Sequence, residues 1–115
     1  MQKTSWAAID KEHLSVLLTR QTVFGENATL APLFAEKGVT VPHMKHVNEE
    51  YSWIISGSQK FLFDDREFVA TAGDVIVIPP NVAHSITILE ATEFVDFFAP
   101  ARENWLQGKD QYLRG

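Results

Sequence analysis

The stretch GVTVPHMKHVNEEYSWIISG, residues 38–57, decides the fold of this chain. It contains two of the four histidines, His43 and His46, together with the acidic residue Glu50. Successive side chains of a β-strand point to opposite faces of a sheet. An extended backbone here therefore places Met44 and His46 on one face and His43 on the other.

A second stretch, GDVIVIPPNVAHSITI at residues 73–88, carries another histidine, His84. Its short apolar run VIVI is typical of a buried strand, and the following prolines Pro79 and Pro80 end that strand. Imidazole and carboxylate groups that meet from separate strands form either a metal site or an acid–base site. The two stretches together therefore predict a chemical site between strands.

The spacing of the first stretch resembles the first motif of the cupin family. Gly38 and Gly57 frame His46 and Glu50 at the spacing of that motif, whereas Met44 stands where the family has its first ligand histidine. Since every other position fits, this departure concerns the metal site and leaves the resemblance in fold intact.

The second stretch resembles the second cupin motif. Gly73, Pro79 and His84 match, whereas Asn81 and Ile88 replace a glycine and an asparagine. The resemblance implies an all-β fold, the cupin double-stranded β-helix or jelly-roll barrel, with a short C-terminal helix. It says little about function, because cupins host many unrelated activities.

Length and composition limit the classes of protein to which the chain can belong. A chain of 115 residues with 45% apolar residues forms one domain, residues 1–115, with a sizeable core. A net charge of −5 argues against a nucleic-acid binder or an anionic-membrane binder. Cysteine is absent, so metal ligands must be His, Asp, Glu or Met. No apolar run near the N-terminus has the length of a signal peptide, and we expect a cytoplasmic protein.

Alternating apolar residues and turn signals predict about ten short strands, consistent with a small sandwich or barrel. Residues 1–12 read as an edge strand or an arm, and only Ala101–Gln107 reads as helical. The predicted strands are Leu14–Phe24, Thr29–Glu36, Val39–His46, Glu50–Ser56, Gln59–Phe63, Arg66–Ala70, Val75–Ile78, His84–Leu89 and Thr92–Ala99.

The cupin resemblance implies that His46, Glu50 and His84 bind a divalent metal ion inside the barrel, with Fe, Mn, Zn or Ni as candidates. The alternative is that these polar groups only satisfy one another. Met44 is a soft filler of the barrel, a weak thioether ligand that favours copper, or the mark of a cupin that works without metal. His43 is expected to point outward, and a bulge that shifts the register would turn it inward.

The C-terminal residues Asp96, Phe98 and Arg102 resemble the tail of small single-domain cupins of the KdgF group, which open unsaturated uronate monosaccharides to linear keto sugars. The resemblance implies catalytic roles for all three. An arginine at the barrel mouth clamps a carboxylate, an aspartate moves a proton and a phenylalanine covers a sugar face. The alternative is a structural ion pair between Arg102 and Asp96.

These observations favour an enzyme that acts on a small anionic sugar or keto acid by proton transfer, with or without a metal. Two other classes stay open: a non-catalytic small-molecule sensor, and a dioxygenase built on a two-histidine, one-carboxylate iron site. Cupins are usually dimers, and Trp53, which alternates outward from Glu50 and Ser52, indicates a homodimer face.

Overall fold

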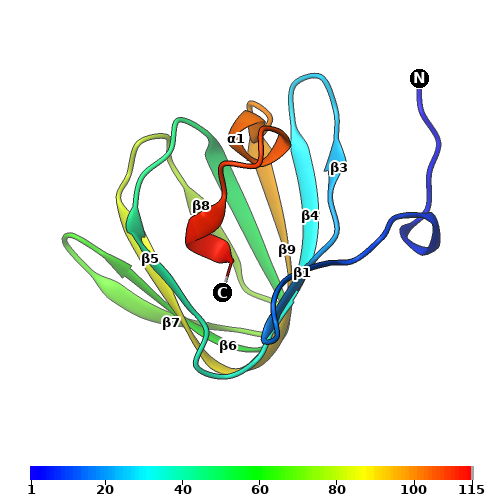
Figure 1. The fold of residues 1–115 in the computed structure, drawn as a ribbon. Coiled ribbons are helices and arrows are strands. Elements are labelled where there is room, and N and C mark those ends of the chain that lie inside the picture. Colours follow the sequence, from blue (N-terminus) through cyan, green and yellow to red (C-terminus); the bar gives the residue numbers. More distant parts are fainter. Residues whose placement is uncertain (115) are drawn as a thin grey trace.

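The computed structural model describes residues 1–114, which form a β-barrel that a short C-terminal segment enters from one end (Figure 1). An arm with one 3₁₀ turn, η1 (Trp6–Ala8), precedes the barrel. The strands are β1 (Glu12–Ser15), β2 (Leu18–Arg20), β3 (Val23–Phe24), β4 (Thr29–Ala35), β5 (Thr40–Met44), β6 (Glu49–Phe63), β7 (Glu67–Thr71), β8 (Val75–Ile78) and β9 (His84–Ala99).

Two long strands, β6 and β9, pair with each other and hold the barrel together. The first half of β6 also pairs with β8 and its second half with β7. Likewise, the first half of β9 pairs with β5 and its second half with β4. All these pairings are antiparallel, and β1 and β2 extend the sheet beyond β4. Since β6 and β9 run along the whole barrel, they can bring residues from both motifs into its interior.

Gly57 marks the bend in β6. Its φ is +83°, and a Cβ atom built there would lie 2.1 Å from the carbonyl oxygen of Ala91 on β9. The register of the β6–β9 pair shifts on both sides of this point. A glycine at the end of the first motif is therefore required by close backbone contact between the two long strands.

Asn81 shows why the second motif tolerates its departure from the family. Its φ is +62°, and it is the single non-glycine residue with a positive φ among residues 1–114. Its N–H donates to the carbonyl oxygen of His46 at 2.8 Å. Asparagine adopts left-handed backbone more readily than other non-glycine residues, so it replaces the motif glycine in this turn.

The apolar side chains that alternate along the strands fill the barrel. Burial alternates regularly along β4 and β9, as period 2 requires. The core comprises Leu14, Leu18, Ala31, Leu33, Ala35, Ile54, Phe61, Ala70, Ile76, Ile78, Ile86, Ile88, Phe94, Phe98 and Trp105. The interior is therefore mostly apolar, and its few polar side chains stand out.

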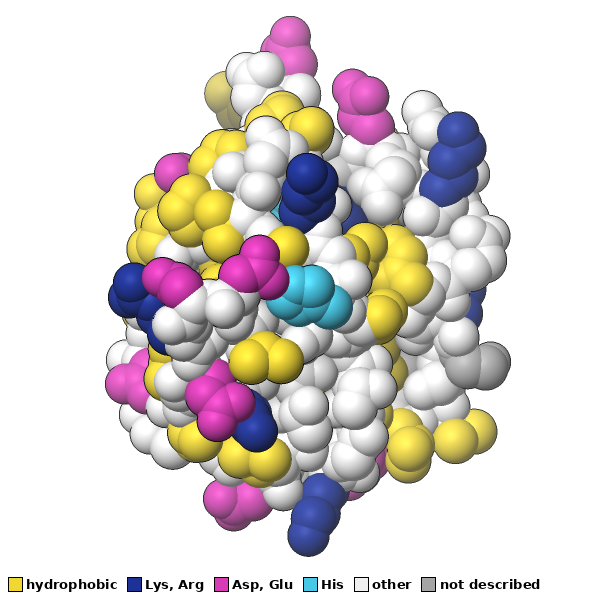
Figure 2. All heavy atoms as spheres, turned by 90° about the vertical axis from the view of Figure 1, so that its left-hand side faces the viewer, with side chains coloured by type: hydrophobic (Ala, Val, Ile, Leu, Met, Phe, Trp, Pro, Cys, Tyr) yellow, Lys and Arg dark blue, Asp and Glu magenta, His cyan; other side chains and the backbone are white. Residues whose placement is uncertain are grey.

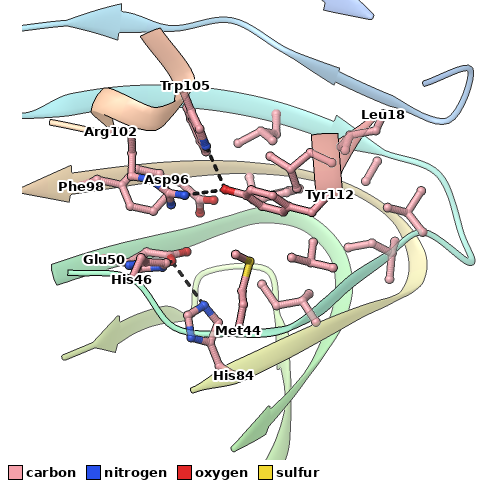
Figure 3. A pocket seen from close by; sticks show the side chains of 18 residues that line it. Leu18, Met44, His46, Glu50, His84, Asp96, Phe98, Arg102, Trp105 and Tyr112 are labelled. Atoms are coloured by element: carbon pink, nitrogen blue, oxygen red, sulfur yellow. Dashed lines mark hydrogen bonds and ion pairs between the residues drawn. The ribbon is translucent and has the colours of Figure 1, made fainter. Parts of the chain in front are cut away.

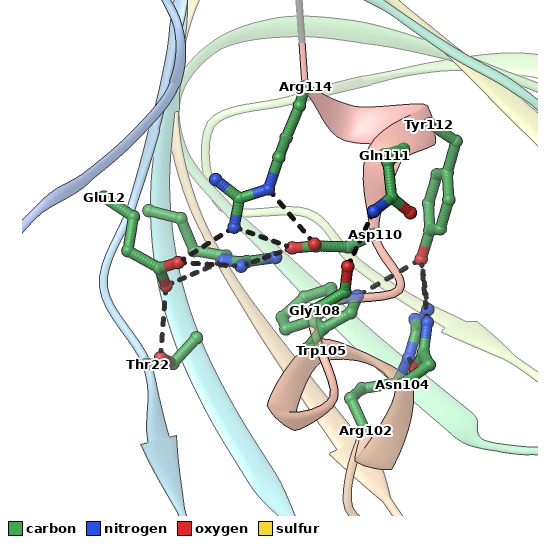
Figure 4. A network of polar contacts seen from close by, with 11 residues as sticks. Glu12, Thr22, Arg102, Asn104, Trp105, Gly108, Asp110, Gln111, Tyr112 and Arg114 are labelled. Atoms are coloured by element: carbon green, nitrogen blue, oxygen red, sulfur yellow. Dashed lines mark hydrogen bonds and ion pairs between the residues drawn. The ribbon is translucent and has the colours of Figure 1, made fainter.

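The chain after β9 folds back over one end of the barrel through α1 (Glu103–Leu106) and the 3₁₀ turn η2 (Gln111–Leu113). A cluster of ion pairs holds this segment (Figure 4). Arg20 and Arg114 both bind the buried carboxylate of Asp110, at 2.7 Å and 3.1 Å. Glu12 on β1 pairs with both arginines. The tail is thus attached to β1 and β2 through side chains.

The expected all-β barrel with a short C-terminal helix is confirmed. Six predicted elements were wrong in detail. Leu14–Phe24 is divided into β1, β2 and β3, because the residues after Ser15 form a turn. The helix covers four residues instead of Ala101–Gln107, and the four strands predicted within 50–63 and 84–99 are two continuous bent ones.

The outer surface carries mixed charge. Figure 2 shows acidic and basic side chains interspersed with hydrophobic ones on one face, with a histidine near its middle. No helix within residues 1–114 is long and apolar enough to cross a membrane.

Candidate active site

Three side chains of the two motifs meet inside the barrel. One ligand atom from each of His46, Glu50 and His84 lies within 4.8 Å of the others. The Nε2 atom of His46 lies 3.1 Å, and that of His84 3.6 Å, from the same Glu50 carboxylate oxygen. Glu50 is the second residue of β6 and His84 the first of β9, while His46 lies in the loop before β6 (Figure 3). The two long strands therefore bring the predicted residues together.

Both imidazoles are oriented by backbone carbonyl groups. Nδ1 of His46 lies 3.0 Å from the carbonyl oxygen of Asn48, and Nδ1 of His84 lies 2.9 Å from that of Val82. A carbonyl oxygen only accepts, so Nδ1 carries the hydrogen in each ring and Nε2 faces Glu50. This is the outer-shell arrangement usual for histidines that bind metal.

The donor set fits a divalent cation. With Nδ1 protonated, a neutral imidazole presents the lone pair of Nε2 to the carboxylate oxygen of Glu50, and these two acceptors repel each other. A proton on Nε2 or a metal ion among the three groups removes this repulsion. Two imidazoles and one carboxylate are a ligand set for iron, manganese or zinc.

Attraction between the charged forms of Glu50 and its histidine neighbours shifts the pKa values of Glu50 and His84. Burial raises the pKa of Glu50, but hydrogen bonds and charge interactions with His46 and His84 outweigh burial and leave the pKa below its usual value. Burial lowers the pKa of the His84 imidazole, but Glu50 and the carbonyl group of Val82 leave it raised. Carboxylate and imidazole therefore each favour the charged form of the other.

Met44 lines the same cavity, whereas His43 does not. A register shift between Val41 and Met44 marks a bulge in β5, but His43 still points outward, where its Nε2 lies 3.0 Å from Asp64 on an exposed surface. His13 is exposed as well. The expectation that His43 lies outside is confirmed. Of the three interpretations of Met44, its place beside the cavity fits both the filler and the thioether ligand.

Asp96 is a second carboxyl group in this cavity, separate from the ion-paired set. It lies on β9 opposite Ser52, is 7% exposed, and its Oδ1 has no hydrogen-bond partner among residues 1–114. Burial raises the pKa of Asp96 well above its usual range, and the charge of Glu50 adds to this, while Ser52 and Arg102 lower it less. A buried carboxyl group with a raised pKa in a pocket is typical of a proton donor.

Arg102 is a buried cation without an anionic partner. It is 3% exposed and forms no ion pair with any carboxylate of the described chain, including Asp96. Its guanidinium group lies 4.7 Å above the rings of Phe98 and Trp105, and its Nε donates to Asn104 at 3.1 Å. The alternative of a structural Arg102–Asp96 ion pair is therefore wrong, and Arg102, which was expected at the barrel mouth, is buried.

The backbone around Arg102 is fixed by two side chains, Thr29 of β4 and Asn48 of the loop before β6. The side-chain amide of Asn48 donates to the carbonyl oxygens of Pro100 and Ala101, at 2.6 Å and 3.2 Å. The N–H of Arg102 donates to Thr29 Oγ1 at 2.9 Å. Because these partners are buried, the guanidinium group is directed inward, away from solvent.

Phe98 connects the two halves of the site. Its ring lies 5.8 Å from the imidazole of His46 and 5.1 Å from the indole of Trp105, both edge-on. The cavity that these side chains line measures about 50 Å³. It has apolar walls from several strands, while the metal-ligand set, Asp96 and Arg102 supply its polar groups.

Three residues around Arg102 were not predicted from the sequence: Asn104, Trp105 and Tyr112. Trp105 and Tyr112 line the cavity, and Asn104 bonds to the groups around Arg102. Tyr112 lies among polar residues, and no periodic pattern in that stretch indicates that its side chain lines a cavity. One signal was available for Trp105: it lies three residues after Arg102 in a stretch predicted to be helical, and residues with this spacing are neighbours on a helix.

A small antiparallel barrel with a two-histidine, one-carboxylate set between its two longest strands defines a class of β-barrel proteins whose pocket lies inside the barrel. The family model described as Cupin domain matches residues 33–98. The chain belongs to the cupin family, and the recognition of both motifs is confirmed.

Solved structures share this fold. An RmlC-like cupin from Shewanella frigidimarina is 24% identical and superimposes with a TM-score of 0.83, covering 91% of this chain and 96% of that one. KdgF from Halomonas sp. is 16% identical, with a TM-score of 0.77 and coverage of 84% and 92%. The polyketide cyclase RemF from Streptomyces resistomycificus is 17% identical, with a TM-score of 0.71 and coverage of 87% and 79%. No curated protein matches the chain.

Proposed function

We propose that this cupin is an enzyme that binds a small carboxylate-bearing sugar or keto acid and moves a proton on it, with the ring opening of an unsaturated uronate as the reaction. One observation carries the proposal. A buried carboxyl group with a raised pKa and one unpartnered oxygen, Asp96, and a buried guanidinium group without a counter-ion, Arg102, line one cavity. An anionic substrate supplies the charge that Arg102 lacks.

The chemistry requires only proton movement. Opening of an unsaturated uronate removes the proton of the anomeric hydroxyl group, breaks the bond between the anomeric carbon and the ring oxygen, and adds a proton to the double bond next to the carboxylate. The reaction is an isomerisation, so the protons balance. A neutral Asp96 donates the second proton and is restored by the first. Phe98 packs against the apolar face of the ring.

His46, Glu50 and His84 are the residues that would hold a divalent ion. When bound, such an ion supplies Lewis-acid polarisation of a substrate oxygen. Asp96 and Arg102 belong to the other half of the cavity, and their tasks are to move a proton and to orient the acid group. The likeness in fold to KdgF and the matching tail residues support this assignment.

Turnover of an unsaturated galacturonate, followed by the loss of the ultraviolet absorbance of its conjugated double bond, tests the proposal. We expect activity in the wild type, with Asp96→Asn retaining binding and losing at least about a hundredfold in rate, the scale of a proton-transfer group. Binding without any turnover in the wild type would instead support the sensor.

The metal-ligand set favours one rival function. Two histidines and one carboxylate also form the facial triad of non-haem iron oxygenases. Purified protein that contains iron and consumes oxygen with a keto acid, and that leaves uronates unchanged, would identify a dioxygenase.

We also propose that the protein is a homodimer. The outer faces of β6, β8 and β9 present a continuous apolar surface, on which Tyr51 lies between Val77 and Phe97 and Trp53 lies beside Val75. Trp53 is 51% exposed. Large exposed apolar patches mark interaction sites. Sedimentation should give a dimer that Trp53→Glu converts to a monomer.

A further inference from the structure

Three N–H donors converge on one oxygen atom, the hydroxyl oxygen of Tyr112 (Figures 3 and 4). Arg102 Nη2 lies 2.5 Å away, Trp105 Nε1 3.2 Å and Asn104 Nδ2 3.4 Å. A phenol oxygen offers two lone pairs and carries its own hydrogen, whereas a carboxylate offers about four acceptor positions and no hydrogen. The arrangement of donors therefore suits a carboxylate better than a phenol.

The charge at this point leads to the same conclusion. The guanidinium group of Arg102 is buried, and its oxygen partners are neutral: Tyr112 and Asn104. A buried cation is costly unless an anion or strong hydrogen bonds compensate it. The faces of Phe98 and Trp105 contribute cation–π attraction, which replaces a counter-ion only in part.

We propose that Arg102, Asn104 and Trp105 form a carboxylate subsite, and that Tyr112 is an internal stand-in whose hydroxyl oxygen leaves when the carboxylate of a ligand arrives. The inference rests on the proposed function only in that Arg102 receives the acid group of the ligand. It adds two residues to the subsite and assigns Tyr112 control over access to it.

The size of the cavity requires such a movement. The cavity measures about 50 Å³, which is small for a six-carbon sugar acid, so outward movement of one wall would make room for the ligand. Tyr112 and Leu113 form one wall of this space.

The segment that carries this wall can leave once a few side-chain contacts break, among them the ion pairs of Arg114 with Glu12 and Asp110. The backbone hydrogen bonds formed by the N–H groups of Leu113 and Arg114 stay within residues 110–114. Attachment to the barrel runs through side chains, chiefly from Asp110 to Arg20. Residues 111–114 can therefore move outward without breaking strand pairing.

Calorimetric titration with D-galacturonate, a saturated uronate, tests the subsite. Tyr112→Phe removes the competing oxygen and keeps the ring, so we expect affinity to rise about 3- to 10-fold, the value of one exchanged hydrogen bond. Asn104→Leu removes one donor to the subsite and the acceptor that orients Arg102 Nε, so it should lower affinity by at least a similar factor. Tyr51→Phe, on the outer face, is the matched control and should change nothing.

A second readout does not depend on the folding of one variant. The indole proton of Trp105 is bonded to Tyr112 in the free protein, so its NMR resonance should shift when galacturonate replaces that partner. Unchanged or weaker binding by Tyr112→Phe overturns the inference, as does an indole resonance that ignores saturating ligand, or no binding by either protein. Tighter binding by Tyr112→Phe without any turnover of unsaturated uronates supports the subsite and removes only the proposed reaction.

Discussion

Met44 lies directly opposite His84 across the pairing of β5 with β9, and both side chains line the cavity. A ligand at position 44 would therefore lie beside the three ligands that the chain already presents. We expect Met44→His to tighten binding of Zn²⁺ or Mn²⁺ by at least about tenfold, because even outer-shell partners of metal ligands are worth about 10- to 100-fold.

Competition with a chromogenic chelator measures this affinity. His46→Ala with His84→Ala is the control that should abolish binding, whereas His13→Ala, at an exposed site, should leave it unchanged. Equal metal content in the wild type and in the double variant would show that the ion binds elsewhere.

Asp96→Asn is expected to stabilise the protein at neutral pH while it removes activity. The pKa of Asp96 in the folded state is raised above its value in the unfolded chain, about 4. Below that value the group is protonated in both states. As the pH rises towards the folded pKa, the unfolded chain releases its proton first, so the folded state loses stability. The asparagine variant avoids this loss.

Thermal melts from about pH 3 to 8, with a chelator present, check this prediction. The melting temperature of Asp96→Asn should exceed that of the wild type increasingly as the pH rises, and the difference should vanish near pH 3. Asp10→Asn, at an exposed site, is the control without such a trend. A variant that melts lower than the wild type at pH 7 would mean that the Asp96 carboxyl group is structurally required.

Asp110 should show the opposite dependence on pH. Burial raises its pKa, but Arg114 and Arg20 outweigh burial and leave the pKa lowered. Its stabilising contribution is therefore present above the unfolded pKa of about 4 and is lost as the pH falls through the folded pKa. Asp110→Asn should lower the free energy of unfolding at pH 7 by about 3 kcal/mol, because it leaves a buried arginine short of a partner.

Denaturant titrations at several pH values measure this difference. Asp65→Asn breaks an exposed pair with Arg66 and should leave the free energy of unfolding nearly unchanged. If the two variants lose the same stability, the ion pairs of Asp110 with Arg20 and Arg114 contribute no more than a surface pair.

Gly57→Ala is expected to be among the most damaging single changes in the chain. The added Cβ would lie 2.1 Å from the Ala91 carbonyl oxygen, in addition to the strain of a positive φ. Gly38→Ala has the same strain, with nothing within 4 Å of the new atom. We expect a loss of about 1–2 kcal/mol at Gly38 and clearly more at Gly57. Chemical denaturation measures the free energy of unfolding of both variants. The difference between them gives the cost of the close contact, because the backbone strain is common to both.

Much of the barrel and the metal-ligand set could be predicted from the sequence, because both follow from local rules. Period 2 along β6 and β9 and the spacing of the motifs were enough to group His46, Glu50 and His84. The contact of Tyr112 with Arg102 depends on how residues 107–113 fold back, for which no periodic signal exists. The burial of Arg102 likewise depends on that fold-back, and a charged residue after the last strand is otherwise expected at the surface.

The last prediction concerns Arg102 as the anchor of the substrate. A bidentate contact between a guanidinium group and a carboxylate in a desolvated pocket is worth about 2–3 kcal/mol, which corresponds to about a 30- to 100-fold change in affinity. Arg102→Lys keeps the charge but loses the planar fork, so it should weaken galacturonate binding by at least about tenfold. Arg102→Met should weaken binding more, yet cost little stability, because replacing a buried, unpaired charge by an apolar chain of similar length is often neutral.

A structural role for Arg102 predicts the reverse: a lower melting temperature for Arg102→Met and an unchanged affinity in whatever fraction stays folded. Calorimetric titration beside thermal melts distinguishes the two, with Arg66→Met, an exposed arginine on the β6–β7 hairpin, as the control for the loss of one positive charge.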